Sequence, residues 1–207
     1  MTLSNTWNRL IYTLYAPFYD LAAAPFERGR ERAVGGLALD GSERVLVPAC
    51  GTGLDLEYFP DGTDVTAIDL VPAMVERADE RTETLDLNLE TRVGDATTID
   101  APDDPYDVVC LHLVLSVVPD PEAVLQEAVR VLDPDGRISI YDKFVPTEES
   151  ASITRRVVDP AAKVLFADRN RSLEPMLERA GLEAGEREAF LGGVYEVTVA
   201  RPAGAGG

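Results

Sequence analysis

The spacing of hydrophobic residues changes near residue 40 of the chain. Before that point, apolar side chains recur with gaps of three, one and three residues, as on one face of an α-helix; they are Trp7, Leu10, Ile11, Leu14, Tyr15, Phe18 and Tyr19. Pro25 opens a second helical stretch over residues 26–37, which the adjacent Gly35 and Gly36 weaken. We therefore expect residues 1–38 to form an N-terminal helical cap that is part of the same domain as the rest of the chain.

After residue 40, short apolar runs alternate with charged helical segments. The runs predict strands at residues 44–49, 64–69, 90–93, 106–113, 136–142 and 195–200. Helices are predicted at residues 72–84, 121–132 and 173–180, where Pro72 and Pro121 suit the first helical position. Apolar strands separated by helices are typical of a doubly wound α/β fold with a mostly parallel sheet. This core is expected to span residues 39–201, and residues 202–207 are expected to form a flexible tail.

The charge of the chain is strongly negative. Thirty-seven acidic and 19 basic residues give a net charge of −18, spread along the sequence. Binding to nucleic acid depends on a basic face that displaces counterions, so nucleic acid is not expected as a partner. The acidity fits either simple solubility or adaptation to molar salt, where screening makes a highly acidic surface tolerable. We favour a halophilic protein.

Length and composition indicate one soluble globular domain. The chain has 207 residues, of which 45% are hydrophobic and 27% are charged, which is enough to form a core. Its longest apolar run, residues 108–118, is shorter than the about 20 residues that a membrane helix needs, and its first residues do not resemble a signal peptide. Cys50 and Cys110 lie in apolar runs, as reduced core thiols do, and no metal-ligand spacing occurs. We expect a cytoplasmic protein without a metal site.

A glycine-containing turn follows the first predicted strand. Residues 45–54 read as an apolar strand, the turn Cys50-Gly51-Thr52-Gly53 and the start of a helix. Glycine lets a ligand approach the backbone, and open α/β sheets bind ligands at the carboxyl ends of their strands. The turn is therefore a candidate ligand site, although an ordinary strand-to-helix turn has the same pattern.

Two acidic residues are expected at the same edge of the sheet. Asp69 ends the second strand, 18 residues after Gly51, where a carboxylate can accept from both hydroxyls of a ribose; a helix N-cap ahead of Pro72 is the alternative. Asp95 follows the third strand and suits an adenine amino group, or else lies in a solvated turn. The dinucleotide fingerprint G-x-G-x-x-G/A needs a small third residue, where this chain has Leu56. A nucleoside without a pyrophosphate therefore fits better than a dinucleotide.

These segments, in their order, resemble class I S-adenosylmethionine-dependent methyltransferases over roughly residues 40–145. Besides the glycine turn and the two acids, the resemblance rests on residues 106–109, 118–121 and 130–132. Within that superfamily the chain is most similar to the ubiquinone and menaquinone C-methyltransferases and the bacterial phospholipid N-methyltransferases. The segments that indicate this group are Tyr15-Ala16-Pro17-Phe18-Tyr19-Asp20, Gly51-Thr52-Gly53-Leu54 and Leu115-Ser116-Val117-Val118-Pro119-Asp120-Pro121.

The resemblance implies a seven-stranded sheet whose last strand, residues 195–200, is antiparallel, and S-adenosylmethionine as the cofactor. It assigns the cofactor site to residues at the strand ends: Gly51 and Gly53 for the methionine part, Asp69 for the ribose, Leu70, Met74, Asp95 and Ala96 for the adenine, and Leu111 and His112 beside the sulfonium. Ala49, next to the glycine turn, is also included in the cofactor site. The apolar members also fit plain core positions. The chain departs from the family at Val47, where an acid is usual, and the following Pro48 must end or bulge the strand.

The resemblance further implies methyl transfer to a small or lipid-like acceptor, such as a phospholipid amine or an isoprenoid quinone precursor. In-line transfer needs alignment and exclusion of water rather than a nucleophilic side chain, and a general base assists it. His112, the only histidine, and Tyr19 are candidates for that base, although His112 also fits a hydrogen-bonded core position. Tyr15, Tyr19, Asp142 and Lys143 are candidates for contact with the acceptor; core packing of the tyrosines and a surface ion pair between Asp142 and Lys143 are the alternatives.

Two other functions fit the sequence. A nicotinamide-dependent oxidoreductase would bind a pyrophosphate at the same glycine turn. A non-catalytic S-adenosylmethionine-binding regulatory protein would account for the missing acid at Val47. If the acceptor is a lipid, the apolar face of residues 7–19 would touch the edge of a membrane; the sequence selects neither the acceptor nor the oligomeric state.

Overall fold

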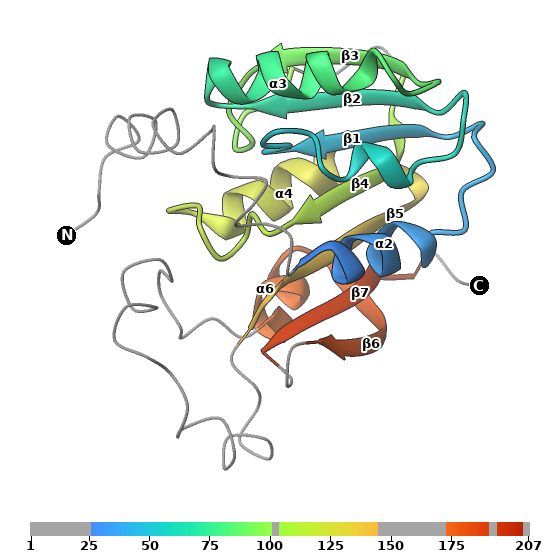
Figure 1. Cartoon of the computed structure of the whole chain (residues 1–207). Helices are drawn as coiled ribbons and strands as arrows, with labels where there is room; N and C mark the ends of the chain where they lie inside the picture. Colours follow the sequence, from blue (N-terminus) through green and yellow to red (C-terminus); the bar gives the residue numbers. More distant parts are fainter. Residues whose placement is uncertain (1–25, 101–103, 145–172, 191–193, 205–207) are drawn as a thin grey trace, which may run out of the picture.

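Seven strands form a single sheet in the computed structural model of the chain, which describes residues 26–100, 104–144, 173–190 and 194–204 (Figure 1). Their order across the sheet is β3-β2-β1-β4-β5-β7-β6. The strands are β1 Arg44–Pro48, β2 Asp64–Asp69, β3 Asn88–Val93, β4 Tyr106–His112, β5 Leu132–Lys143, β6 Leu182–Phe190 and β7 Tyr195–Pro202. The first five are parallel to one another, whereas β7 runs antiparallel between β5 and β6. The expected seven-stranded sheet with an antiparallel last strand is confirmed.

Helices cover both faces of this sheet. On one face lie α2 Glu27–Gly35, the short 3₁₀ helix η2 Leu56–Tyr58 and α3 Pro72–Thr82, and on the other lie α4 Pro121–Val131 and α6 Leu173–Arg179 (Figure 1). Val34 of α2 packs with Val45 and Val47 of β1 on the first face. Leu46, between them in the sequence, packs on the second face with α4 and α6. The doubly wound arrangement predicted from alternating strands and helices is confirmed.

Local sequence explains where α4 begins. Pro121 stands in its first turn, where the missing N–H is not needed. Asp120 caps the helix, because its side chain accepts a hydrogen bond from the Ala123 N–H at 3.0 Å. The buried residues of the helix then follow helical spacing; they are Val124, Leu125, Ala128 and Val131. The helix predicted at residues 121–132 is confirmed, and it ends one residue earlier than predicted.

The central strands are buried on both faces, as their continuous apolar runs predict. In β4, Val108, Val109, Cys110 and Leu111 have no exposed surface. β1 ends at Pro48, which has no N–H to donate to a neighbouring strand. The prediction that the strand ends or bulges at this proline is therefore confirmed.

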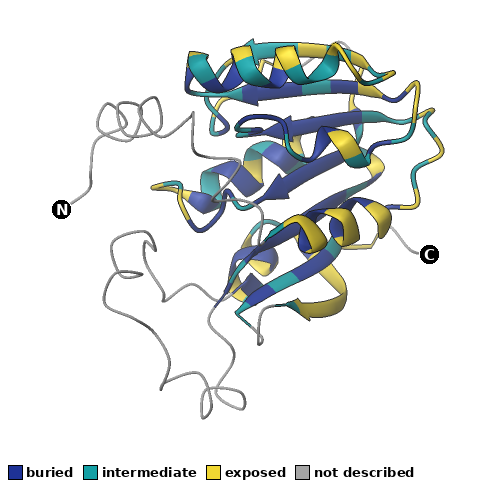
Figure 2. Cartoon of the chain, viewed as in Figure 1, coloured by how far each residue is buried: buried dark blue, intermediate teal, exposed yellow. Residues whose placement is uncertain are grey.

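The outer strand β6 is not predicted by the hydrophobic pattern. Residues 183–189 are all exposed (Figure 2), and this segment has none of the β-branched or aromatic residues that are enriched in strands. The strand is held by its backbone pairing with β7. Burial patterns cannot reveal a strand that has neither of its faces in the core.

β5 begins earlier than predicted. It starts at Leu132, which we expect to end a helix, and contains a register shift where β4 pairs with it. Gly136 lies at this irregularity, and a Cβ there would come within 2.9 Å of the carbonyl oxygen of Asp107. The strand therefore begins four residues before the predicted start at residue 136. The added residues contribute one pair, Leu132 with Tyr106, and continuous pairing begins at Arg137, next to the predicted start.

Several expectations concern residues outside the described ranges. Tyr15 and Tyr19, with the rest of the N-terminal cap before residue 26, are among them, so the cap and the domain boundaries stay predictions. Within the ranges that are described, no helix is long and apolar enough to cross a membrane. The halophilic character and the cytoplasmic location also stay predictions.

Candidate functional site

The carboxyl ends of the five parallel strands meet at one edge of the sheet, which we call the carboxyl rim. Among the described residues, three non-glycine residues have a positive φ, and two of them lie at this rim: Ala49 (54°) after β1 and Leu113 (58°) after β4. This conformation costs about 1–2 kcal/mol for a residue with a side chain. Backbone strain of this kind is concentrated at functional sites. Both observations favour the carboxyl rim as the ligand site.

The glycine turn follows β1 and is fixed by hydrogen bonds. The Cys50 N–H donates to a carbonyl of β2 at 2.9 Å, and the Gly53 N–H donates to the Cys50 carbonyl at 3.0 Å. From α3, Arg81 Nε donates to the Thr52 carbonyl at 3.0 Å. Gly51 and Gly53 have φ values of 57° and 78°, which favour glycine. The turn therefore has one defined shape. Gly51 has no side chain to block a ligand, whereas the missing Cβ of Gly53 makes room for Leu56 and Ala78.

Asp69, the last residue of β2, connects the turn to the start of α3. Its Oδ2 accepts a hydrogen bond from the Gly51 N–H and its Oδ1 one from the Val71 N–H, both at 2.9 Å. Burial raises the pKa of this carboxyl, and these backbone hydrogen bonds oppose the rise. Val71, and not Asp69, is the N-cap residue of α3. Because each carboxylate oxygen can accept a further hydrogen bond, Asp69 can hold the turn and bind two hydroxyls at once.

Asp95 and Ala96 follow β3 at the same rim. Asp95 Oδ1 accepts hydrogen bonds from the Thr97 N–H at 2.9 Å and from the Thr97 hydroxyl at 2.8 Å, which closes a local Asx turn. Its Oδ2 makes no hydrogen bond within the part of the chain that the structure describes. Ala96 is buried against the core under α4. The turn interpretation therefore accounts for one oxygen of Asp95 and leaves the other for a ligand.

The apolar candidates divide into rim and core positions. Met74 is buried with Val71 in a small cluster at the start of α3, separate from the main cores, and Leu70 is half-buried next to Val71 in the sequence. Leu111 is fully buried in the core that α4 covers. Met74 and Leu70 stay candidates for contact with an adenine, whereas the structure gives Leu111 the plain core position.

Four buried polar side chains link the turn to α2, β4 and β5, and we call them the buried polar network. Asp55 Oδ2 accepts from Arg30 at 2.7 Å, and Asp55 Oδ1 lies 2.9 Å from His112 Nδ1. His112 Nε2 lies 2.8 Å from Ser139 Oγ, and the Ser139 hydroxyl donates to the Ala33 carbonyl at 3.3 Å. Burial by itself would raise the pKa of Asp55, but attraction to His112 and Arg30 outweighs it, so the pKa lies below the usual range.

Both ring nitrogens of His112 are engaged in this network. Nδ1 carries a proton because the ionised Asp55 can only accept, and Nε2 faces the Ser139 hydroxyl. The side chain has no exposed surface. Neither nitrogen is left to take a proton from an acceptor, so the geometry agrees with the core interpretation of His112 better than with a general base.

Asp142 lies at the carboxyl end of β5 and has no exposed surface. Its Oδ2 accepts from the Ser116 N–H at 3.0 Å, and its Oδ1 accepts from the Lys143 N–H at 2.7 Å. Burial raises the pKa of the carboxyl. Attraction from Lys143 is among the effects that oppose this rise, but the carboxylate is buried and is not a surface group. The carboxylate instead holds the segment that follows β4 at the carboxyl rim.

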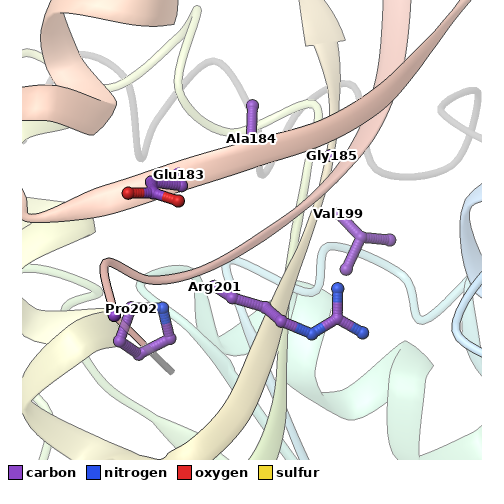
Figure 3. A pocket seen from close by; sticks show the side chains of 7 residues that line it. Glu183, Ala184, Gly185, Val199, Arg201 and Pro202 are labelled. Atoms are coloured by element: carbon purple, nitrogen blue, oxygen red, sulfur yellow. The ribbon is translucent and has the colours of Figure 1, made fainter. Parts of the chain in front are cut away.

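A hollow of about 340 Å³ lies away from these residues, between β6 and β7 (Figure 3). Its lining includes Glu183, Val199 and Arg201. β7 runs antiparallel to β5, so the start of β7 pairs with Lys143 at the carboxyl end of β5, and residue 200 pairs with Ile138, nearer the amino end. The residues of β7 that line the hollow come from the end of β7. The hollow therefore lies toward the edge of the sheet opposite the carboxyl rim and does not belong to the candidate site.

Cys50 and Cys110 are free and buried, as the sequence predicts. Burial, together with repulsion from Asp69 and Asp55, raises the pKa of the Cys50 thiol, and burial with repulsion from Asp55 raises that of Cys110. Since the thiolate is the reactive form, we expect neither thiol to react with Ellman's reagent in the folded protein at about pH 8. Both should react after denaturation. Fast labelling of either thiol in the native protein would contradict this prediction.

The lowered pKa of Asp55 predicts how stability changes in acid. The folded-state pKa lies below the unfolded value of about 3.9, so the stabilisation from ionised Asp55 is complete above that value and is lost as the pH falls toward the folded pKa. Unfolding by urea, followed from about pH 5 to about pH 2.5, should show the difference between wild type and Asp55→Asn shrinking only below about pH 4. The exposed Asp64→Asn is the control and should show no such change. A difference that stays constant down to about pH 2.5 would contradict the ionised assignment.

Three members of the buried polar network belong to no sequence motif. The position of Arg30 gives one signal, because it precedes the apolar residues Ala33 and Val34 by three and four residues and so lies on the apolar face of its helix. An arginine in such a position needs a buried acceptor. Asp55 and Ser139 give no comparable signal, since only the fold brings them to His112.

Comparison with known proteins agrees with this geometry. The family model described as a methyltransferase domain matches residues 46–140. The phosphatidylethanolamine N-methyltransferase of Cereibacter sphaeroides is 39% identical over 103 residues, 49% of this chain, and the chain spans about half of that relative (51%). The demethylmenaquinone methyltransferase of Thermus thermophilus is 31% identical over 156 residues, which cover 71% of this chain and 70% of the relative.

Solved structures share the fold at low sequence identity. A chain of the complex between the Haloferax volcanii Trm112 methyltransferase activator and a methyltransferase has a TM-score of 0.73 at 17% identity, covering 93% of this chain and 97% of that one. A SAM-dependent methyltransferase from Aquifex aeolicus has a TM-score of 0.59 at 23% identity, covering 83% and 87%.

The fold is a doubly wound α/β sheet whose carboxyl rim carries a glycine turn that is hydrogen-bonded to Asp69. The chain belongs to the family of S-adenosylmethionine-dependent methyltransferases, as its motifs imply, and S-adenosylmethionine is the cofactor of this family. Family membership decides against the nicotinamide-dependent alternative.

Proposed function

We propose that the protein transfers a methyl group from S-adenosylmethionine to a small or lipid-like acceptor. The observation that carries the proposal is Asp69, which joins the end of β2 to the bare backbone of the turn at Gly51. The two curated relatives described above are named for phosphatidylethanolamine and demethylmenaquinone. A phospholipid amine or an isoprenoid quinone precursor is therefore the class of acceptor that we favour.

The described residues fit the adenosyl part of this cofactor. Asp69 retains one acceptor position on each oxygen for the two ribose hydroxyls. Asp95 Oδ2 would accept from the adenine amino group, and the backbone of Ala96 would face a ring nitrogen. Ala49 and the glycines of the turn would line the methionine part. Val47 does not take part, because it is buried in the core.

S-adenosylmethionine supplies a methyl group activated by a sulfonium. The protein then has to align the acceptor with that group and exclude water, and needs no nucleophilic side chain. Asp142 and Lys143 lie at the carboxyl rim and stay candidates for the part of the protein next to the acceptor. His112 has no free nitrogen to act as a base. Tyr19, which is outside the described residues, stays the candidate for that step.

Calorimetry with S-adenosylmethionine and S-adenosylhomocysteine, at low and at molar salt, tests whether the protein binds this cofactor. Heat of binding with a defined stoichiometry is expected, and folded protein that binds neither molecule would overturn the proposal. Transfer of a radiolabelled methyl group is then measured to vesicles of phosphatidylethanolamine, to demethylmenaquinone and to fractionated cell extract. Binding without transfer to any fraction would indicate the non-catalytic alternative.

A further inference from the structure

The buried polar network begins and ends at α2 and includes Asp55, which follows the glycine turn. It runs from Arg30 of α2 to Asp55, on to His112 at the end of β4 and to Ser139 of β5, with contacts of 2.7, 2.9 and 2.8 Å. The Ser139 hydroxyl then returns to α2, at the Ala33 carbonyl. Three elements of the fold are thereby tied to one residue, Asp55, that follows the turn by two positions.

A gain in the stability of the folded protein does not by itself explain why these polar groups are buried. Arg30, Asp55 and His112 are at most 5% exposed, and removing charged groups from water is costly. Well-packed apolar residues often replace buried ion pairs with no loss of stability. Buried polar groups do, however, have directional contacts that fix one arrangement of the backbone. The arrangement fixed here is that of Asp55 and the residues bonded to it.

Backbone hydrogen bonds transmit the position of Asp55 to the turn. The N–H of Leu56, its neighbour, donates to the Gly53 carbonyl at 3.0 Å, and the Gly53 N–H donates to the Cys50 carbonyl at 3.0 Å. Asp69 holds the other end of the turn through Gly51. The turn is therefore held from two sides by two carboxylates, one on β2 and one in the network.

We propose that Arg30, Asp55, His112 and Ser139 are positioning residues that hold the glycine turn in the shape that binds S-adenosylmethionine. The inference rests on the proposed function and deepens it. The chain has Val47 in place of the acid that the family resemblance implies on β1, and Val47 is buried among apolar side chains. Asp55 supplies a buried carboxylate from the other end of the same turn.

The test compares two variants of the network with a matched control outside it. Asp55→Asn removes the charge at the centre, and Ser139→Ala removes one hydroxyl and leaves the ion pair. Leu177→Ala creates a cavity on the opposite face of the sheet, in α6. For each full-length protein, the Kd for S-adenosylhomocysteine is measured by calorimetry and the midpoint of thermal unfolding by circular dichroism.

We expect Asp55→Asn to raise the Kd about tenfold or more and Ser139→Ala about threefold, because the turn loses its fixed shape. Leu177→Ala should lower the unfolding midpoint and leave the Kd within about twofold, since binding is measured on folded protein. If Asp55→Asn does not fold, Ser139→Ala carries the test. Network variants that fold and bind with the wild-type Kd would overturn the inference. Wild-type protein that does not bind would overturn the proposed function, and this inference with it.

Discussion

Asp69→Ala is expected to weaken binding of S-adenosylhomocysteine at least about hundredfold. Hydrogen bonds to a charged group contribute about 1.5–3 kcal/mol each, and we propose that Asp69 accepts two from the ribose. The variant also leaves the N–H groups of Gly51 and Val71 without their acceptor. Calorimetry on the folded variant measures the loss, which combines the missing ribose contacts with a less ordered turn.

Two further substitutions separate these contributions. Asp64→Ala removes an exposed carboxylate from the other end of the same strand and should bind as wild type does. Asp69→Asn keeps one acceptor oxygen but presents an NH₂ group to a second donor, so its loss should lie between those of wild type and Asp69→Ala. Folded Asp69→Ala with a Kd near that of wild type would remove Asp69 from the site.

Gly53→Ala is expected to lower the free energy of unfolding by about 3 kcal/mol. Its φ of 78° costs a residue with a side chain about 1–2 kcal/mol. The added Cβ would also lie 2.7 Å from Leu56 Cδ1 and 3.1 Å from Ala78, and Leu56 is only 1% exposed and cannot move aside. Overpacking of this kind adds about 1–3 kcal/mol.

Gly62→Ala is the matched control for the part of this loss that comes from overpacking. Its φ is 81°, close to that of Gly53, and a Cβ there would meet no atom within 4 Å. Urea unfolding of both variants should therefore show the backbone cost of about 1–2 kcal/mol at Gly62 and a larger loss at Gly53. Equal losses would mean that the turn does not pack tightly on α3.

The parts of the fold that the sequence predicts are those with buried strands. β2 is found at the residues predicted, 64–69, because Val65, Ala67 and Ile68 are buried in the core. β6 escapes prediction because its residues 183–189 are exposed. Pairing with β7 holds the strand, together with ion pairs of Arg187 and apolar contacts of Leu182 and Phe190 at its two ends. The pattern of hydrophobic residues predicts a strand from the burial of its side chains. It therefore cannot predict a strand whose side chains are exposed and which is held by backbone pairing.

The candidate site also contains residues that the sequence predicts and residues that it does not. Asp69 and Asp95 are predictable because the end of a parallel strand fixes the edge of the sheet at which they lie. Asp55 is not, because its partners Arg30 and His112 are 25 and 57 residues away in the sequence. The position of His112 at the end of β4 is itself predictable from the apolar run that it ends. What it touches there depends on which face of the strand it occupies, and α2 covers that face.

The exposed strand β6 also affects how copies of the molecule meet. An uncovered strand edge is a template for pairing with a second chain. On this edge the exposed residues include Glu183, Glu186 and Glu188. Two such edges brought together would place like charges opposite each other, which is unfavourable. The same acidic residues that hide this strand from hydrophobic analysis thereby protect the protein against open-ended aggregation through its sheet.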